Sequence, residues 1–327
     1  MVLTTGFREG GAKRPQGRIV FAAETDYKAD IFVINADGSH RRNLTRSDAF
    51  EQGPDWSPNG KSIVYVNASD GRGGALYRIA ANGAHPQVLF REPANQIMGD
   101  PAWSPDGRRV AFTSARNGNL EVWTYSIGGG FTQITRDGFA GNPTWSPNGK
   151  QLTYAGLISP GHATIFVSSA DGTNRHDVSH APFDDSLPVW SPDGRWIALR
   201  SLNADWQQHE QDSLVIVNPA GTARKTLVTG GGIFPAAWSP RGDAILFQWN
   251  SDPEHPTTSR RQLYIVPFSG GKELAVRDRR TRNPKRRAAI AMPAQAANNN
   301  VPDNVFTLNT CTDDHQIIYP PAFLTSR

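Results

Sequence analysis

A five-residue pattern, Trp-Ser-Pro-x-Gly, occurs five times in this 327-residue chain and constrains its fold more than any other feature. Successive copies are separated by 42 to 48 residues. Their tryptophans are Trp56, Trp103, Trp145, Trp190 and Trp238. Repeats of about 40 to 50 residues that each contain several strands are typical of β-propellers. The repeat therefore predicts an all-β ring of similar units.

The second copy illustrates how one unit predicts four antiparallel strands. A first strand ends at Trp103, and Ser-Pro-Asp-Gly then favours a tight turn, because proline presets φ and glycine accepts positive φ. The second strand follows at Val110–Phe112 and the third at Val122–Tyr125, both rich in β-branched and aromatic residues. Thr132–Thr135 is the fourth. Each copy thus predicts one four-stranded blade.

The third-strand pattern recurs six times, once more than the Trp-Ser-Pro-x-Gly pattern, and so it indicates the number of blades better. A sixth copy of it lies at Asp30–Asn35, before the first Trp-Ser-Pro-x-Gly, in a unit that lacks only a first strand. Gln316–Phe323 resembles Ile233–Trp238 and is expected to supply that strand; the alternatives are that Met1–Pro15 supplies it or that nothing does. The predicted fold is a six-bladed β-propeller of four-stranded antiparallel blades, with the N-terminal blade completed by a C-terminal strand.

Composition divides the chain into four segments. Residues 1–16 form an N-terminal extension, residues 17–276 the propeller, residues 277–301 a linker, and residues 302–327 a C-terminal segment that closes the ring. The linker begins with a basic run, Arg277–Arg287, which holds seven of the 34 lysines and arginines, and it ends in alanines and asparagines. Such low-complexity sequence buries too little apolar surface to order itself.

The repeat resembles that of TolB-like propellers, on the evidence of Trp-Ser-Pro-Asp-Gly followed by Arg-Arg-Val-Ala-Phe-Thr-Ser and an aromatic third strand. The resemblance covers roughly residues 17–276, and the family's signal peptide and N-terminal α/β domain are not seen. It implies a ring-shaped surface that binds proteins, an ion or ligand near the axial channel, and a periplasmic location. Because Met1–Gly17 has no apolar segment of a signal peptide, a cytoplasmic location stays open.

Polar residues just before each first strand are expected to line the mouth of the central channel. They converge from several blades and could bind a cation such as calcium, which prefers oxygen ligands, or hold a partner segment; alternatively they only solvate the channel. No cofactor is required by the sequence. These residues are Glu51, Gln52, Gln96, Asp100, Asn142, Asp184, Asp185 and Ser186. The five tryptophans are interpreted as packing between blades.

Catalytic motifs are not evident in the sequence. It contains neither a Gly-x-Ser-x-Gly nucleophile elbow, nor a phosphate-binding loop, nor His-Glu-x-x-His. We therefore expect a non-enzymatic scaffold that binds another protein or peptide at the channel face. The alternative is a metal-dependent carbohydrate-active lyase or hydrolase, for which His162, His176 and His180 offer few ligands.

Other partners are less favoured by the sequence. The basic run has no interleaved aromatic residues, which argues against stacking on single-stranded nucleic acid. No apolar run approaches the roughly 20 residues that span a bilayer. The single cysteine, Cys311, excludes an internal disulfide. A monomeric propeller is expected.

Overall fold

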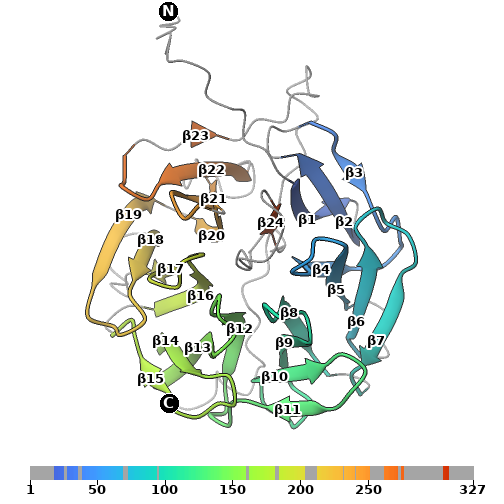
Figure 1. Ribbon diagram of the computed structural model, residues 1–327, viewed down its shortest axis with the longest axis horizontal. Helices are drawn as coiled ribbons and strands as arrows, with labels where there is room; N and C mark the ends of the chain where they lie inside the picture. Colours follow the sequence, from blue (N-terminus) through green and yellow to red (C-terminus); the bar gives the residue numbers. More distant parts are fainter. Residues whose placement is uncertain are drawn as a thin grey trace, which may run out of the picture.

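The computed structural model describes residues 18–25, 28–35, 39–68, 73–93, 96–159, 162–180, 184–202, 212–230, 232–239, 241–250, 261–271, 274–275 and 305–308. Within these residues every regular element is a β-strand, and Figure 1 shows the strands arranged in a ring of blades around an axis. They form six four-stranded sheets. The predicted six-bladed propeller is therefore confirmed.

Five blades follow one plan, in which neighbouring strands are antiparallel and follow one another in chain order from the axis to the rim. Blade 2 contains β4 (Glu51–Trp56), β5 (Ser62–Asn67), β6 (Ala75–Ala80) and β7 (Gln87–Arg91); blade 3 contains β8 (Met98–Trp103), β9 (Arg109–Ser114), β10 (Glu121–Ser126) and β11 (Phe131–Gln133). Blade 4 contains β12 (Ala140–Trp145), β13 (Gln151–Ser159), β14 (His162–Ser169) and β15 (His176–Asp177). Blade 5 contains β16 (Asp184–Trp190), β17 (Ile197–Leu202), β18 (Asp212–Val217) and β19 (Arg224–Gly230); blade 6 contains β20 (Ile233–Trp238), β21 (Ala244–Asn250), β22 (Arg261–Pro267) and β23 (Leu274–Ala275).

Blade 1 is built from both ends of the chain. Its sheet has the order β24 (Val305–Leu308), β1 (Arg18–Thr25), β2 (Lys28–Asn35), β3 (Arg42–Asn43). A C-terminal strand thus completes the N-terminal blade, as predicted, but it is Val305–Leu308, and it runs parallel to β1. A strand that arrives from a distant segment is not held antiparallel by a tight turn, which explains the departure from four antiparallel strands. The predicted strand Gln316–Phe323 and the linker lie outside the described residues.

The repeated tryptophans are buried between neighbouring blades. Each of the five is only 1 to 5% exposed. Trp56, for example, packs in one cluster with Val20 and Ile31 of blade 1 and with Ile63 of blade 2. Because large aromatic side chains bury extensive apolar area, this position holds adjacent sheets together once per blade.

A second repeated contact joins the turns of adjacent blades. The proline of each Trp-Ser-Pro-x-Gly turn lies beside the glycine of the next turn: a β-carbon at Gly107 would be 3.7 Å from Pro58 Cδ. The corresponding separations for the pairs Pro105–Gly149, Pro147–Gly194 and Pro192–Gly242 are 3.5, 3.6 and 3.7 Å. Four junctions, from blade 2 to blade 6, therefore share this contact.

The hydrogen bonds of the indole N–H groups predict that replacing the tryptophan costs more stability at some blade junctions than at others. Trp145 Nε1 donates a hydrogen bond to the carbonyl of Ala102 at 3.2 Å, whereas the buried Nε1 of Trp190 has no partner. Trp145→Phe should therefore lower the free energy of unfolding by about 1–2 kcal/mol more than Trp190→Phe, as measured by urea denaturation. Trp238→Phe should resemble Trp145→Phe, because its indole donates to the carbonyl of Val189. Equal losses in all three variants would contradict this account.

Candidate functional site

The inner strands β4, β8, β12, β16 and β20 contact one another in turn around the axis, and β24 closes the circle between β20 and β4. Each of the five antiparallel inner strands contains a bulge opposite the second strand of its blade. In four of them the first bulged residue has positive φ and precedes a proline: Gly53, Asp100, Asn142 and Leu187. Bulges bend a strand and change the direction of its side chains. They do so here at the end of the strands where the sequence predicted a site.

Asp100 and Asn142 are brought together across the junction of blades 3 and 4. Thr113 Oγ1 donates to Asp100 Oδ2 at 3.0 Å, and the backbone N–H of Asn142 donates to Thr113 Oγ1 at 3.2 Å. Burial raises the pKa of Asp100, and hydrogen bonds from Thr113 and Asn142 oppose that shift. Both residues are only partly exposed. They form a small polar cluster on the inner wall.

Glu51 begins β4 but is almost fully buried, at 3% exposure. Ser47 Oγ donates to its Oε1 at 2.9 Å, while its Oε2 has no partner. Burial raises the pKa of Glu51 to about 7, hydrogen bonds from Thr45 and Ser47 partly oppose the shift, and the nearby charge of Asp30 adds to it. Burial therefore favours the protonated form of this carboxyl, which lies in the wall between blades 1 and 2.

The raised pKa of Glu51 predicts that the free energy of unfolding falls as the pH rises. The unfolded carboxyl releases its proton near pH 4.5, whereas the folded one keeps it to about pH 7, so stability should decrease across that interval and level off above it. Glu51→Gln should remove this slope and raise the free energy of unfolding at about pH 8 by about 2 kcal/mol. Asp171→Asn is the control, because hydrogen bonds from Thr173 lower the pKa of that exposed carboxyl. Identical pH profiles for the parent and Glu51→Gln would refute the prediction.

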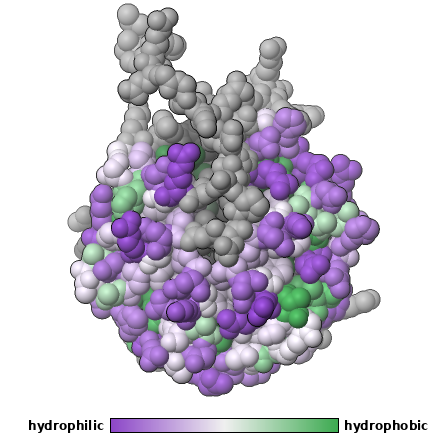
Figure 2. Space-filling model, in the orientation of Figure 1, coloured by the Kyte–Doolittle hydropathy of each residue, from purple (hydrophilic) through white to green (hydrophobic). Residues whose placement is uncertain are grey.

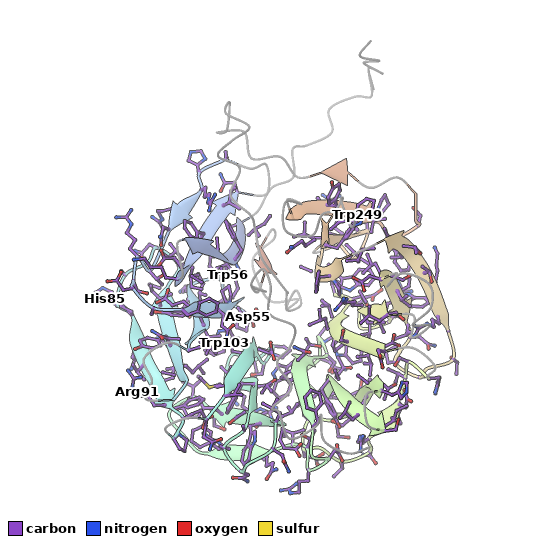
Figure 3. All side chains as sticks on the ribbon, turned by 180° about the vertical axis from the view of Figure 1, so that it is seen from behind. Asp55, Trp56, His85, Arg91, Trp103 and Trp249 are labelled. Carbon is purple, nitrogen blue, oxygen red and sulfur yellow. The ribbon has the colours of Figure 1, made fainter. Side chains whose placement is uncertain are left out.

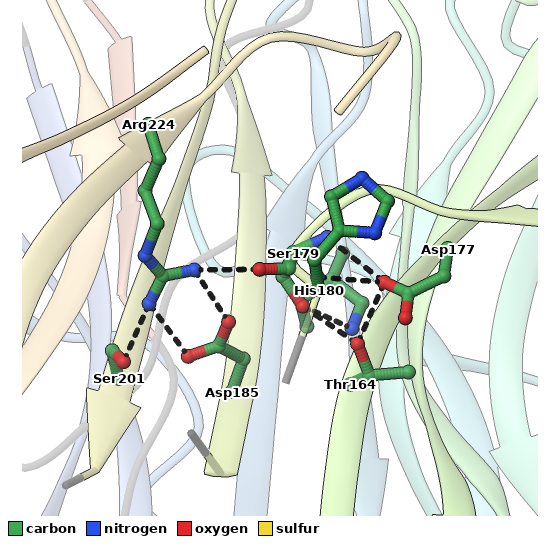
Figure 4. Close-up of polar contacts among 8 residues, drawn as sticks. Thr164, Asp177, Ser179, His180, Asp185, Ser201 and Arg224 are labelled. Carbon is green, nitrogen blue, oxygen red and sulfur yellow. Dashed lines mark hydrogen bonds and ion pairs between the residues drawn. The ribbon is translucent and has the colours of Figure 1, made fainter. Parts of the chain in front are cut away.

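Asp185 is the second buried acid of the predicted set. Figure 4 shows its carboxylate facing Arg224, which reaches it from β19. Arg224 donates to both carboxylate oxygens at 2.8 and 3.1 Å, to Ser201 Oγ at 2.7 Å and to the carbonyl of Ser179 at 3.1 Å. The Asp185 side chain is 1% exposed. Its contacts are thus all within the fold.

The remaining predicted residues are partly exposed. Asp184 Oδ1 accepts the backbone N–H of Ala163 at 3.1 Å and lies 3.6 Å from Nδ1 of His162. Gln52 and Ser186 are in β4 and β16, and Gln96 precedes β8. Of the eight residues, only Asp100 and Asn142 are brought into direct contact by the described hydrogen bonds.

A cation site is not assembled by these side chains. The carboxylates of Glu51, Asp100, Asp184 and Asp185 each accept hydrogen bonds from protein groups, as described above. Across the described ranges there is no cluster of three or more His, Cys, Asp or Glu suited to a metal. His176 is exposed and its Nε2 contacts the carbonyl of Pro219 at 3.0 Å; His180 is exposed too. Within the described ranges these eight side chains do not gather into a ligand cluster for the calcium suggested by the sequence.

Sequence reasoning missed Thr113 and Arg224, the two partners that organise the predicted acids. It also missed the positive φ of Leu187, which is uncommon for a bulky residue. One signal was available: a proline stands two residues before the tryptophan in four copies of the repeat. A proline within an antiparallel strand marks an edge or a bulge.

The ring of six blades with inner-strand bulges defines a six-bladed β-propeller. Both its repeat and its fold are TolB-like. Over 60 residues the chain is 42% identical to the Tol-Pal system protein TolB of Wolbachia sp. subsp. Drosophila simulans (strain wRi), and 40% identical to that of Wolbachia pipientis subsp. Culex pipiens (strain wPip). Each match spans 17% of this chain and only 14% of the relative. No family model matches the chain.

Solved structures extend the likeness in fold to most of the chain. TolB from Acinetobacter baumannii superposes with a TM-score of 0.65 at 19% identity, covering 80% of this chain and 66% of that one. Putative TolB from Agrobacterium tumefaciens gives 0.62 at 22% identity, covering 79% and 89%. An oligogalacturonate lyase in complex with manganese gives 0.57 at 15% identity, covering 81% and 75%. The shared fold therefore includes both TolB proteins and enzymes.

Proposed function

We propose that this chain is a non-enzymatic scaffold that binds another protein or peptide at the axial face where its inner strands begin. The observation that supports this most is the Asp100–Thr113–Asn142 cluster, together with partly exposed Gln52, Asp184 and Ser186 in the first halves of other inner strands. These groups offer hydrogen-bond donors and acceptors from several blades at one end of the ring. A partner segment that crosses this end could contact them together.

The surface character agrees with a binding role. Figure 2 shows a largely hydrophilic face, on which hydrophobic side chains gather only locally. Polar and charged rims set the specificity and orientation of protein contacts more than their raw affinity.

The relatives are named as proteins of the Tol-Pal system, and from that likeness we also propose a periplasmic location. Cell fractionation with an antibody tests the location directly; recovery only with cytoplasmic proteins would refute it.

Affinity capture from an extract of the source cells tests the binding role. Gln52→Lys with Asp184→Lys changes the charge where β4 and β16 begin, and Asn148→Lys is the control in the turn between β12 and β13. We expect the parent and control proteins to retain a common partner, and the double variant to retain at least about tenfold less. Equal capture by all three proteins would place the binding elsewhere.

The second candidate is a metal-dependent carbohydrate-active lyase or hydrolase. The observation that favours it is the similarity in fold to the oligogalacturonate lyase. Metal analysis of the purified protein and an assay on acidic oligosaccharides distinguish the two functions. A bound transition metal together with cleavage of such a substrate would replace the scaffold proposal. Within the described ranges no helix is long and apolar enough to cross a bilayer.

A further inference from the structure

Three surface grooves lie at the opposite ends of the inner strands, beside the Trp-Ser-Pro-x-Gly turns. The largest, of about 540 Å³, separates blades 2 and 3 and is lined by Ser57, Ser62, Arg78, His85 and Trp103, among others. In Figure 3, His85 lies at the rim of blade 2 and Trp103 nearer the axis. The grooves between blades 3 and 4 and between blades 4 and 5 measure about 310 and 330 Å³. The blade 2–3 groove is therefore the largest of these three.

One residue position differs between the blade 2–3 groove and the groove between blades 3 and 4. At two junctions the first residue of a blade's second strand faces the tryptophan of the next blade. Arg18 Cζ lies 4.8 Å from the ring centre of Trp56, and Arg109 Cζ lies 4.5 Å from that of Trp145. These planar guanidinium groups cover the indole at two junctions.

The other junctions carry different groups at this position. Between blades 5 and 6, Trp196 packs with Phe268, which also contacts Trp238. Between blades 2 and 3 the residue is Ser62, whose side chain is much shorter than these groups and lines the groove together with Trp103. At this position three other junctions carry a planar side chain, an arginine or a tryptophan, whereas the blade 2–3 junction carries the hydroxyl of Ser62.

The rim of the blade 2–3 groove is positively charged. Lys61 and Arg78 are exposed, and within the described part of the chain their side chains form no hydrogen bond or ion pair. His85 is exposed beside them. The acid of the lining, Asp106, is engaged by its own turn, accepting hydrogen bonds from Ser104 Oγ and the N–H of Arg108. Asp106 keeps its negative charge in these hydrogen bonds, but the two cations Lys61 and Arg78 outnumber it in the lining.

We propose that the blade 2–3 groove binds an acidic peptide segment that inserts one planar side chain beside Ser62. Carboxylates of the segment pair with Lys61 and Arg78, and a ring fills the space beside Ser62 that the side chains of Arg18 and Arg109 occupy at their own junctions. A basic segment is disfavoured, because like charges at the rim repel it. The groove is independent of the axial face, so either surface can bind without the other.

Fluorescence polarisation with labelled peptides tests the proposal on the full chain. The probe is a short peptide of alternating glutamate and glycine with one central tyrosine; two controls replace that tyrosine by alanine or every glutamate by lysine. Lys61→Glu with Arg78→Glu should weaken binding of the probe at least about tenfold. Ser62→Trp should weaken it similarly, because it fills the groove with the residue that blade 5 carries at this place. Gln151→Trp, at the matching position beside Trp190, should leave binding unchanged.

Melting temperatures show that each variant is folded, and the exposed charge variants keep the test decisive if Ser62→Trp unfolds. Tight binding of the acidic tyrosine peptide, weaker binding of both control peptides and loss in the groove variants support the proposal. It is overturned if no saturable binding occurs up to about 1 mM peptide. Equal binding of the lysine peptide, or undiminished binding by the charge-reversed variant, overturns it as well.

Discussion

Arg224→Ala should destabilise the protein by about 3–5 kcal/mol, because it leaves the carboxylate of Asp185 buried without its cation. That carboxylate is 1% exposed and receives two of the four hydrogen bonds that Arg224 donates. Chemical denaturation followed by tryptophan fluorescence measures the loss. A change below about 1 kcal/mol would show that water replaces the guanidinium.

A matched control uses the same substitution at an exposed ion pair. Arg195 and Asp193 are 2.6 Å apart, but their side chains are 80% and 43% exposed. Arg195→Ala should therefore change stability by no more than about 1 kcal/mol. Adding Asp185→Asn to Arg224→Ala should recover part of the lost stability, since it removes the buried charge. Simple additivity of the two losses would contradict a charge-based explanation.

Trp238→Ala should cost about 3–5 kcal/mol, the range for deleting a large buried aromatic side chain. Trp238 is 1% exposed and packs with Val189 of blade 5 and Ile245 of blade 6. Because both blades contribute to its cluster, the substitution should also reduce the cooperativity of unfolding. Differential scanning calorimetry measures both effects.

The control for this deletion is Ile158→Ala, since Ile158 is 47% exposed at the end of β13. Its loss should stay within about 0.5 kcal/mol. If Trp238→Ala were as mild as this, the repeated tryptophan would not hold neighbouring blades together.

The repeat allowed the blades to be predicted because each rests on local chemistry. Ser-Pro-x-Gly specifies a turn, and alternating apolar residues specify the strands on either side. The strand that closes blade 1 has no such turn to mark it in the sequence. The prediction of Gln316–Phe323 as this strand therefore rests only on its likeness to β20. Parallel pairing of Val305–Leu308 with β1 depends on tertiary contacts between distant segments.

The eight predicted site residues lie in or just before the inner strands, but their buried contacts were not predictable from the sequence. Alternation along a strand assigns each side chain to one face, and a bulge changes that assignment. Glu51 and Asp185 consequently lie inside the fold, whereas Asp100 and Asn142 meet on the inner wall. The partners Thr113 and Arg224 come from other strands and leave no spacing signal in the sequence.

The contacts between proline and glycine in successive turns link blades 2 to 6 into one arc within the described residues. Blade 1 differs from them because its sheet includes a strand from the far end of the chain, the four-residue parallel strand Val305–Leu308. Under heat, force or protease the annulus should separate first on either side of blade 1, and the remaining arc should be the last part to exchange its amide hydrogens.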